Sequence, residues 1–194
     1  VKKTPLSQFS RPRLNGIIAI DLRDNDKLVN VEITDGEAEV LLVASHGKSI
    51  RFKEEDVRPM GRSAAGVRGI KLPVGDEVIA LSIMRDGLIL TATENGYGKR
   101  TPIDDFPVQG RGGQGVIAIQ TTDRNGKTVG ALQVGADDEV MLISSNGTLV
   151  RTGVDDISIM GRNTQGVRLI RVGKDQRLVG LARIEAIEDD EEGE

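Results

Sequence analysis

The chain has 194 residues, with 26 Lys and Arg against 30 Asp and Glu, a formal net charge of −4, one His and no Cys. Without Cys there are no disulfides and no Cys-ligated zinc, and a single His leaves no conventional hydrolase triad. No apolar run reaches membrane-spanning length and no signal peptide opens the chain, so the sequence predicts a soluble cytoplasmic protein with no membrane contact.

The charge is unevenly distributed. Residues 185–194 hold seven acids and no base, so the preceding residues carry 26 bases against 23 acids. We expect this acidic end to be disordered, because such a run repels itself. One hypothesis is that it competes with nucleic acid for the basic residues; the alternative is a solvated end that makes no contact.

The first residues, Val1-Lys2-Lys3-Thr4, resemble the second strand of a hairpin that recurs three times later. The chain therefore begins inside a repeat, and we interpret it as a fragment of a longer protein. Residues 16–22 and 27–33 are predicted to form the next hairpin. Residues 1–34 thus make a partial first unit.

A glycine that precedes an apolar run recurs at Gly16, Gly66, Gly115 and Gly166, at a spacing of about 50 residues. A period of that size is typical of a propeller, a solenoid or an array. The complete units are residues 35–84, 86–134 and 136–184. Gly66, Gly115 and Gly166 are predicted to be structural, because a strand start after a long loop favours positive φ or close backbone approach.

Each complete unit begins with two apolar runs joined by a turn that contains Gly47, Gly96 or Gly147. Asn-Gly between such runs predicts a hairpin whose two central residues both take positive φ. A second hairpin is expected downstream in each unit, pairing 66–72 with 77–83, 115–121 with 127–134, and 166–172 with 177–184. Four short strands per unit and no extended 3.6-residue apolar period predict an all-β, propeller-like fold.

Catalytic chemistry is poorly supported by the sequence. The adjacent acids Asp104-Asp105 and Asp155-Asp156 fit turn capping better than an acid–base pair. Gly110-x-Gly112 has no helix after it, so it is not a dinucleotide motif. We expect no catalytic residue, no metal site and no cofactor in this chain.

Recurrent cations are the main functional signal. A periodic row of Lys and Arg along a curved edge suits a polyanion such as bent duplex DNA, and the scarcity of aromatic residues argues against single-strand binding. The alternative is that strand ends simply favour cations for solubility. The predicted DNA-binding residues are Lys2, Lys3, Arg13, Arg51, Lys53, Arg62, Lys99, Arg100, Arg111, Arg151 and Arg162.

The repeat, its Gly-Arg-x-x-x-Gly-Val segment and the run Asn95-Gly96-Tyr97-Gly98-Lys99-Arg100-Thr101 resemble the carboxy-terminal domain of DNA gyrase A. The resemblance covers essentially the whole chain. The segment from Gln109 to Gly115 keeps five residues of that family's heptapeptide Gln-Arg-Arg-Gly-Gly-Lys-Gly but lacks two of its three cations. It is therefore similar to a later blade and not to the diagnostic first one.

The resemblance implies a β-pinwheel, whose four-stranded blades exchange a strand with their neighbours. It also implies a basic outer rim that wraps double-stranded DNA and supports ATP-dependent negative supercoiling by the whole topoisomerase. The expected partners are the remainder of gyrase A and the gyrase B protein, while the catalytic residues of the whole enzyme lie outside this chain.

Three alternatives stay open at this point. The equivalent domain of topoisomerase IV has the same kind of blades but matches less well. A propeller that serves as a protein-interaction module is the second, and an enzyme at the central channel of a propeller is the third. Steep salt dependence of duplex binding separates DNA wrapping from the second.

Overall fold

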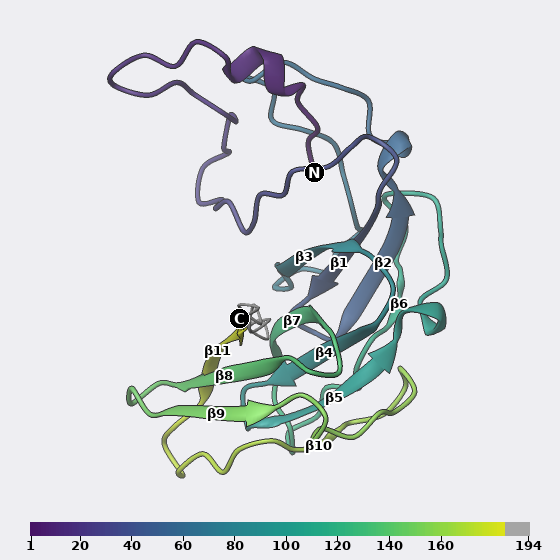
Figure 1. Cartoon of the computed structure of the whole chain (residues 1–194), viewed down its shortest axis with the longest axis vertical. Coiled ribbons are helices and arrows are strands. Elements are labelled where there is room, and N and C mark those ends of the chain that lie inside the picture. Colours follow the sequence, from purple (N-terminus) through teal and green to yellow (C-terminus); the bar gives the residue numbers. More distant parts are fainter. Residues whose placement is uncertain (185–194) are drawn as a thin grey trace, which may run out of the picture.

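A computed structural model describes residues 1–184 of the chain (Figure 1). No α-helix occurs in this part; three short 3-10 turns are η1 (Leu6–Phe9), η2 (Glu54–Asp56) and η3 (Ile103–Asp105). The strands are β1 (Glu39–Ala44), β2 (Lys48–Lys53), β3 (Val78–Met84), β4 (Leu88–Thr93), β5 (Tyr97–Pro102), β6 (Val116–Ile117), β7 (Thr128–Val134), β8 (Glu139–Ser144), β9 (Leu149–Gly153), β10 (Val167–Arg168) and β11 (Leu178–Ile184). The expected all-β class is confirmed.

The strands form three antiparallel sheets, which we call blades. Their strand orders are β3-β1-β2-β6, β7-β4-β5-β10 and β11-β8-β9. β3, β7 and β11 are the inner strands: β7 lies in contact with both of the others, so the blades meet along this edge (Figure 1). The short strands β6 and β10 form the opposite, outer edge of the first two blades.

The first hairpin of each unit forms as predicted. β1 pairs with β2, β4 with β5, and β8 with β9. The expected turn geometry is wrong, however, because only the glycine of each turn has positive φ, as in Gly47 at 79° and Gly96 at 79°. The N–H of that glycine donates to a carbonyl three residues earlier, for example Gly96 to Thr93 at 2.9 Å. A four-residue turn closed by a left-handed glycine therefore replaces the two-residue turn.

The predicted second hairpins are wrong, and the correction defines the architecture. The late strand of each unit pairs with the first strand of its own blade, as β3 does with β1. The other half crosses to the preceding blade, where β6 pairs with β2 and β10 with β5. We call the crossing residues 66–72, 115–121 and 166–172 the donated segments. Apolar periodicity identifies them as strands but cannot say which neighbouring edge satisfies their N–H and C=O groups.

The first unit also departs from the prediction. Residues 16–22 and 27–33 are not strands, and no strand lies between Phe9 and Glu39. Within residues 1–184 no acceptor strand lies beside 16–22, and a strand needs a hydrogen-bonded neighbour to form its ladder. The second half still touches the next blade, because Asn30 Nδ2 donates to the carbonyl of Leu81 at 3.0 Å.

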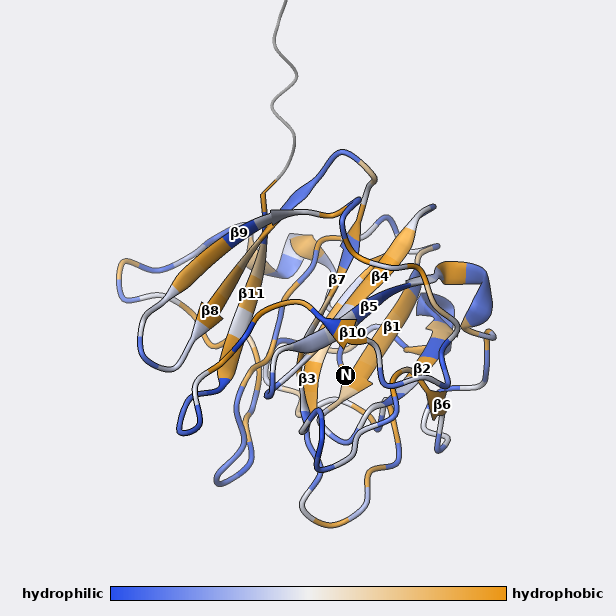
Figure 2. Ribbon diagram, turned by 90° about the horizontal axis from the view of Figure 1, so that it is seen from below, coloured by the Kyte–Doolittle hydropathy of each residue, from blue (hydrophilic) through white to orange (hydrophobic). Residues whose placement is uncertain are grey.

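The hydrophobic core lies between blades as well as within them. Leu41 and Val43 of β1 share a buried cluster with Ile89 of β4, and with Ile103 and Phe106 of the loop after β5. Figure 2 shows the apolar strands facing one another while polar residues colour the connecting loops. Burial of each such side chain contributes about 1.5–3 kcal/mol. A single blade exposes one of these faces, so neighbouring blades stabilise each other.

The recurring glycines hold the crossing points. Gly115 has φ 68° and Gly166 has φ 78°, and a Cβ at Gly115 would lie 2.1 Å from the carbonyl oxygen of Ser49. The same placement at Gly166 would lie 2.5 Å from the carbonyl oxygen of Gly98. Both reasons for a glycine predicted from the sequence therefore apply: a left-handed backbone and close approach of the acceptor strand.

Candidate nucleic-acid interface

The arginines predicted to form one phosphate-binding row have different environments. Arg51 Nη1 donates to the carbonyls of Ile103 at 2.9 Å and Phe106 at 3.1 Å, and its Nε donates to Glu39 at 2.6 Å. Arg100 Nε donates to the carbonyl of Ile157 at 2.5 Å. Each guanidinium therefore bonds a carbonyl in the loop of the following unit. These two arginines fasten neighbouring blades together.

Arg151 occupies the same repeat position, but its side chain is 59% exposed and, among residues 1–184, pairs with Glu139 of its own blade alone. The pKa of Arg151 is raised, first by the hydrogen bond to Glu139 and then by its charge. Lys3, also at this position, donates to the carbonyl of Glu54 at 3.1 Å. Of these four cations, Arg151 alone has a mostly exposed charge.

The Gly-Arg arginines make one recurring contact. Arg62 Nη1 donates to the carbonyl of Ile18 at 2.7 Å, and Arg162 Nη1 to that of Ile117 at 2.8 Å. Arg111 Nη1 donates to the carbonyl of Arg68. All three acceptors lie two residues after the recurring glycine of the preceding unit. The Gly-Arg loops, residues 61–65, 110–114 and 161–165, are thus tied to the preceding crossing strand.

Lys99 is fully buried, and it holds the third of these loops. Its Nζ donates to the carbonyl of Gly161 at 2.6 Å, to that of Arg162, and to Thr164 Oγ1 at 3.0 Å. Burial lowers the pKa of Lys99 from 10.5 to about 8, and the nearby charge of Arg162 adds to the shift. Lys2 makes the equivalent contact with the carbonyl of Arg62. Burial likewise lowers its pKa.

Three predicted residues keep exposed charges: Arg13, Lys53 and Arg151. The structure does not bring them to one edge of one blade. The predicted set therefore contains residues that stabilise the blades together with residues that face solvent, and its DNA-binding role stays a prediction.

The sequence reasoning missed a second set of cations, on the donated segments. Arg68, Lys71, Arg168 and Arg171 are all exposed. Arg68 and Arg168 each lie two residues after the recurring glycine, and Lys71 and Arg171 lie five residues after it. The repeat spacing could therefore have identified them. Arg168 lies on β10, at the outer edge of the second blade, and Arg171 follows it, whereas Arg68 and Lys71 lie on the donated segment 66–72, which forms no strand. Exposed cations on such segments can face an extended anionic ligand.

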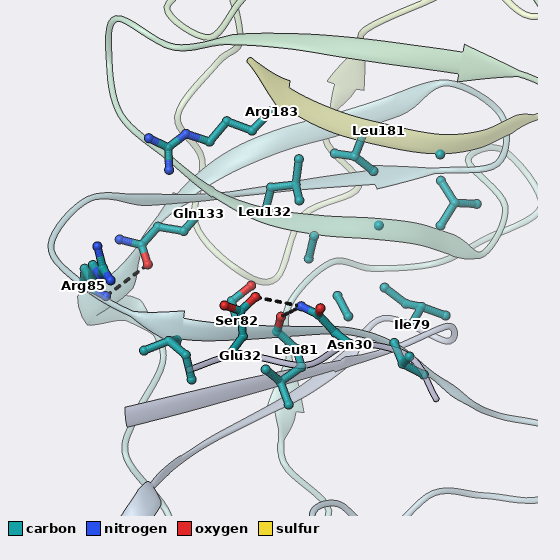
Figure 3. A pocket seen from close by; sticks show the side chains of 17 residues that line it. Asn30, Glu32, Ile79, Leu81, Ser82, Arg85, Leu132, Gln133, Leu181 and Arg183 are labelled. Atoms are coloured by element: carbon teal, nitrogen blue, oxygen red, sulfur yellow. Dashed lines mark hydrogen bonds between the residues drawn. The ribbon is translucent and has the colours of Figure 1, made fainter. Parts of the chain in front are cut away.

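The inner edge carries a hollow with a volume of about 390 Å³. β3, β7 and β11 line it, together with Asn30 and Glu32 of the first unit (Figure 3). The Arg183 side chain pairs with Asp138 at 2.7 Å, and Asn30 Nδ2 donates to Glu32 at 3.0 Å. Arg183 and Asn30 thus each have a partner within the chain.

The part of the chain that the structure describes has neither a candidate metal site nor a candidate membrane-spanning helix. Residues 1–184 contain no group of three His, Cys, Asp or Glu side chains that could hold a metal ion. The same residues form no helix that is long and apolar enough to cross a bilayer. Residues 185–194 lie outside the described residues, so the hypothesis about the acidic end stays a prediction.

Comparison with known proteins gives the family. A family model described as the DNA gyrase C-terminal domain, beta-propeller, matches residues 1–35, 38–83, 87–134 and 138–185. DNA gyrase A of Salmonella typhimurium is 56% identical over 193 residues, 99% of this chain and 22% of that protein. The Escherichia coli protein is 53% identical over the same shares. The chain thus spans about a fifth of the length of these relatives.

Two solved structures have the same fold. The C-terminal domain of DNA topoisomerase IV superposes with a TM-score of 0.89 at 26% identity, over 95% of this chain and 58% of that one. The DNA gyrase A C-terminal domain gives 0.81 at 28% identity, over 88% and 59%. The family model and the sequence relatives decide between the two in favour of gyrase. The chain belongs to the family of C-terminal β-pinwheel domains of DNA gyrase A.

Proposed function

We propose that this chain binds duplex DNA along the outer edge of its blades and takes no catalytic part itself. The observation that carries the proposal is the recurrence of exposed cations on two of the three donated segments, at Arg68, Lys71, Arg168 and Arg171. Neutralising phosphates with such side chains releases condensed counterions, which supplies affinity that does not depend on base sequence. Contacts of this kind position a duplex without reading it.

The blade architecture makes that edge rigid. Arg51, Arg100 and Lys99 each bond backbone carbonyls of the following unit, so neighbouring blades have a fixed relation. Cations held on a rigid support favour a bent duplex when the cost of bending is offset by additional phosphate contacts. In the longer protein, this bending would wrap DNA and support ATP-dependent negative supercoiling.

The family supports the remaining assignments. We infer that the chain works with the remainder of gyrase A and with the gyrase B protein, in the bacterial cytoplasm on the nucleoid. The DNA-cleaving and ATP-hydrolysing groups would lie in those other parts. No cofactor is needed for the binding proposed here.

A salt titration of duplex binding tests the proposal. The triple variant Arg68→Ala, Lys71→Ala and Arg171→Ala should weaken binding to every sequence tested. It should also flatten the slope of log K against log salt by up to about 2.7, which is about 0.9 for each lost phosphate contact.

The control triple is Arg23→Ala, Lys27→Ala and Lys174→Ala, which removes as much exposed charge from connections outside the donated segments. Its slope should stay close to that of the wild type. Equal losses in the two triples would show that only net charge matters. A duplex affinity that does not change with salt concentration would favour a protein-interaction module instead.

A further inference from the structure

Tyr97, the first residue of β5, lies close to two arginines. The Arg124 guanidinium is 5.0 Å from the centre of the Tyr97 ring, and that of Arg168 is 5.3 Å from it. Arg168 Nη2 also donates to the Tyr97 hydroxyl at 2.8 Å. Tyr97 is only 7% exposed, whereas both arginines are exposed. The buried ring is thus in contact with two cations at the protein surface.

The three residues meet through the crossing of the chain between blades. Arg168 lies on β10 and is the cross-strand partner of Tyr97 on β5, at the outer edge of this blade (Figure 1). Arg124 comes from the loop between the donated segment 115–121 and β7. The amide of Asn95 fixes that loop by donating to the carbonyls of Asp123 and Arg124, both at 3.1 Å. The guanidinium of Arg168 and the backbone of Arg124 are therefore held in place before any ligand arrives.

The pair has no counter-charge in the described part of the chain. Within residues 1–184, no carboxylate lies within 4.0 Å of the guanidinium of Arg124 or Arg168. By contrast, Arg51, Arg151 and Arg177 each pair with a glutamate. The phenol responds to the two charges: hydrogen bonding to Arg168, and then to Arg124, lowers the pKa of Tyr97. Two adjacent cations repel each other, and an anion between them would remove that repulsion.

The arrangement occurs once among the described units. In the preceding blade, Lys48 stands at the position of Tyr97 and Ile117 at the position of Arg168, and these two residues are cross-strand partners. That blade therefore has neither the aromatic ring nor the arginine opposite it. Arg68 matches Arg168 by repeat position, and Tyr97 is the single tyrosine of residues 1–184. The feature is therefore not a by-product of the repeat.

We propose that Arg124 and Arg168 form a clamp for one phosphate group, with Tyr97 as the residue that positions them. Guanidinium forks match phosphate oxygens in pairs, and hydrogen bonds between charged partners are about twice as strong as neutral ones. The inference rests on the proposed function in one respect: the phosphate is expected to belong to a DNA backbone passing over the β5–β10 edge. The chemistry of the clamp itself would equally accept a free phosphate anion.

The first test uses pyrophosphate and does not involve DNA. Tyr97 is the single tyrosine in a chain without tryptophan, so the intrinsic tyrosine fluorescence reports on this site alone. Pyrophosphate should change that signal saturably in the wild type, with loss of the saturable change in Arg124→Ala and in Arg168→Ala. Arg68→Ala is the matched control and should titrate like the wild type. Far-UV circular dichroism checks that each variant is folded.

The second test is a pair of double-mutant cycles on duplex affinity. If one phosphate bridges both arginines, the double variant Arg124→Ala with Arg168→Ala should lose no more than the stronger single variant. Arg68→Ala combined with Arg168→Ala should be additive. Tyr97→Phe, which keeps the ring but removes the hydroxyl that Arg168 bonds, should reproduce part of the Arg168→Ala loss.

The outcomes separate the clamp from the proposed function. No saturable pyrophosphate signal, together with an additive Arg124–Arg168 cycle, would overturn the clamp. Saturable pyrophosphate binding with an additive DNA cycle would support a site for free phosphate and overturn the DNA source. A wild type that binds pyrophosphate here but no duplex would support the clamp while the proposed function fails.

Discussion

Two hairpins of this molecule have nearly the same sequence pattern but different surroundings. In the β4–β5 hairpin, β10 of the following unit lies beside β5. In the β8–β9 hairpin, β9 pairs with β8 alone among residues 1–184. The loop of that following unit also covers Arg100, which is 7% exposed, while the Arg151 side chain at the same repeat position is 59% exposed. The environment of a repeat position is therefore set by the next unit and not by the unit that contains it.

The largest expected effect is on the free energy of unfolding, when Arg100 and Arg151 are each replaced by Met. Arg100→Met removes two donors from the carbonyls of Asp155 and Ile157 and leaves these acceptors without their partner. Buried polar groups without partners cost about 1–3 kcal/mol each, so we expect a loss of about 3 kcal/mol in the free energy of unfolding. Arg151→Met should cost less than about 1 kcal/mol, since it breaks one exposed ion pair.

Urea unfolding followed by circular dichroism measures both variants. Similar losses in Arg100→Met and Arg151→Met would contradict the view that the following unit decides the role of this position.

The turn glycines give the second comparison. Gly96 and Gly147 both have positive φ, but a Cβ at Gly96 would lie 2.3 Å from the carbonyl oxygen of Ile170, while nothing lies within 4 Å at Gly147. Gly147→Ala should cost about 1 kcal/mol for the left-handed backbone alone. Gly96→Ala should cost about 2 kcal/mol or more, because the crossing strand must also move. Thermal unfolding of the two variants checks the difference, and equal melting temperatures would remove the close approach as a cause.

The two hairpins should also differ in how their stability depends on pH, because Lys99 of the β4–β5 hairpin is replaced by Val150 at the same position of the β8–β9 hairpin. The folded-state pKa of about 8 lies below the ordinary 10.5, so between these values the unfolded chain binds more protons. The contribution of Lys99 to the unfolding free energy should therefore rise as pH increases from 8 to 10.5. Arg162 and Asp105 are the charged groups that act on Lys99, and Asp105 opposes the shift.

The measurement is the unfolding free energy of the wild type minus that of Lys99→Met, across this pH window. A difference that stays flat would show that Lys99 titrates at its ordinary pKa despite its burial.

The smallest expected effect concerns DNA. Of Arg51, Arg100 and Arg151, only the last has a mostly exposed guanidinium, so it alone is free to contact a phosphate in the folded chain. Arg151→Ala should flatten the salt slope of duplex binding by at most about 0.9. Arg51→Ala should leave the slope unchanged wherever the variant is still folded. A flatter slope in Arg51→Ala would instead return that residue to the phosphate-binding row predicted from the sequence.

The sequence predicts the features that depend on neighbouring residues or on recurrence, and it misses the contacts made between units. The period, the first hairpin of each unit and the role of Gly115 and Gly166 depend on neighbouring residues or on recurrence, and the structure confirms them. Hydrophobic alternation pairs the donated segments with the wrong partner, because pairing between blades leaves no trace in it, and only the family resemblance implies the exchange of strands that the structure has. The roles of Arg51 and Arg100 were hidden for the same reason, since their acceptors are backbone carbonyls in the next unit.

Strand donation also sets an order of assembly during synthesis. β2 ends at Lys53, but the strand that completes its outer edge begins at Val116, after all of β3, β4 and β5. As the chain leaves the ribosome, each blade must wait for the following unit before its sheet is complete, and loops that close late slow folding. A nascent chain therefore always carries one open strand edge at its growing end, and completion passes from blade to blade in the direction of translation.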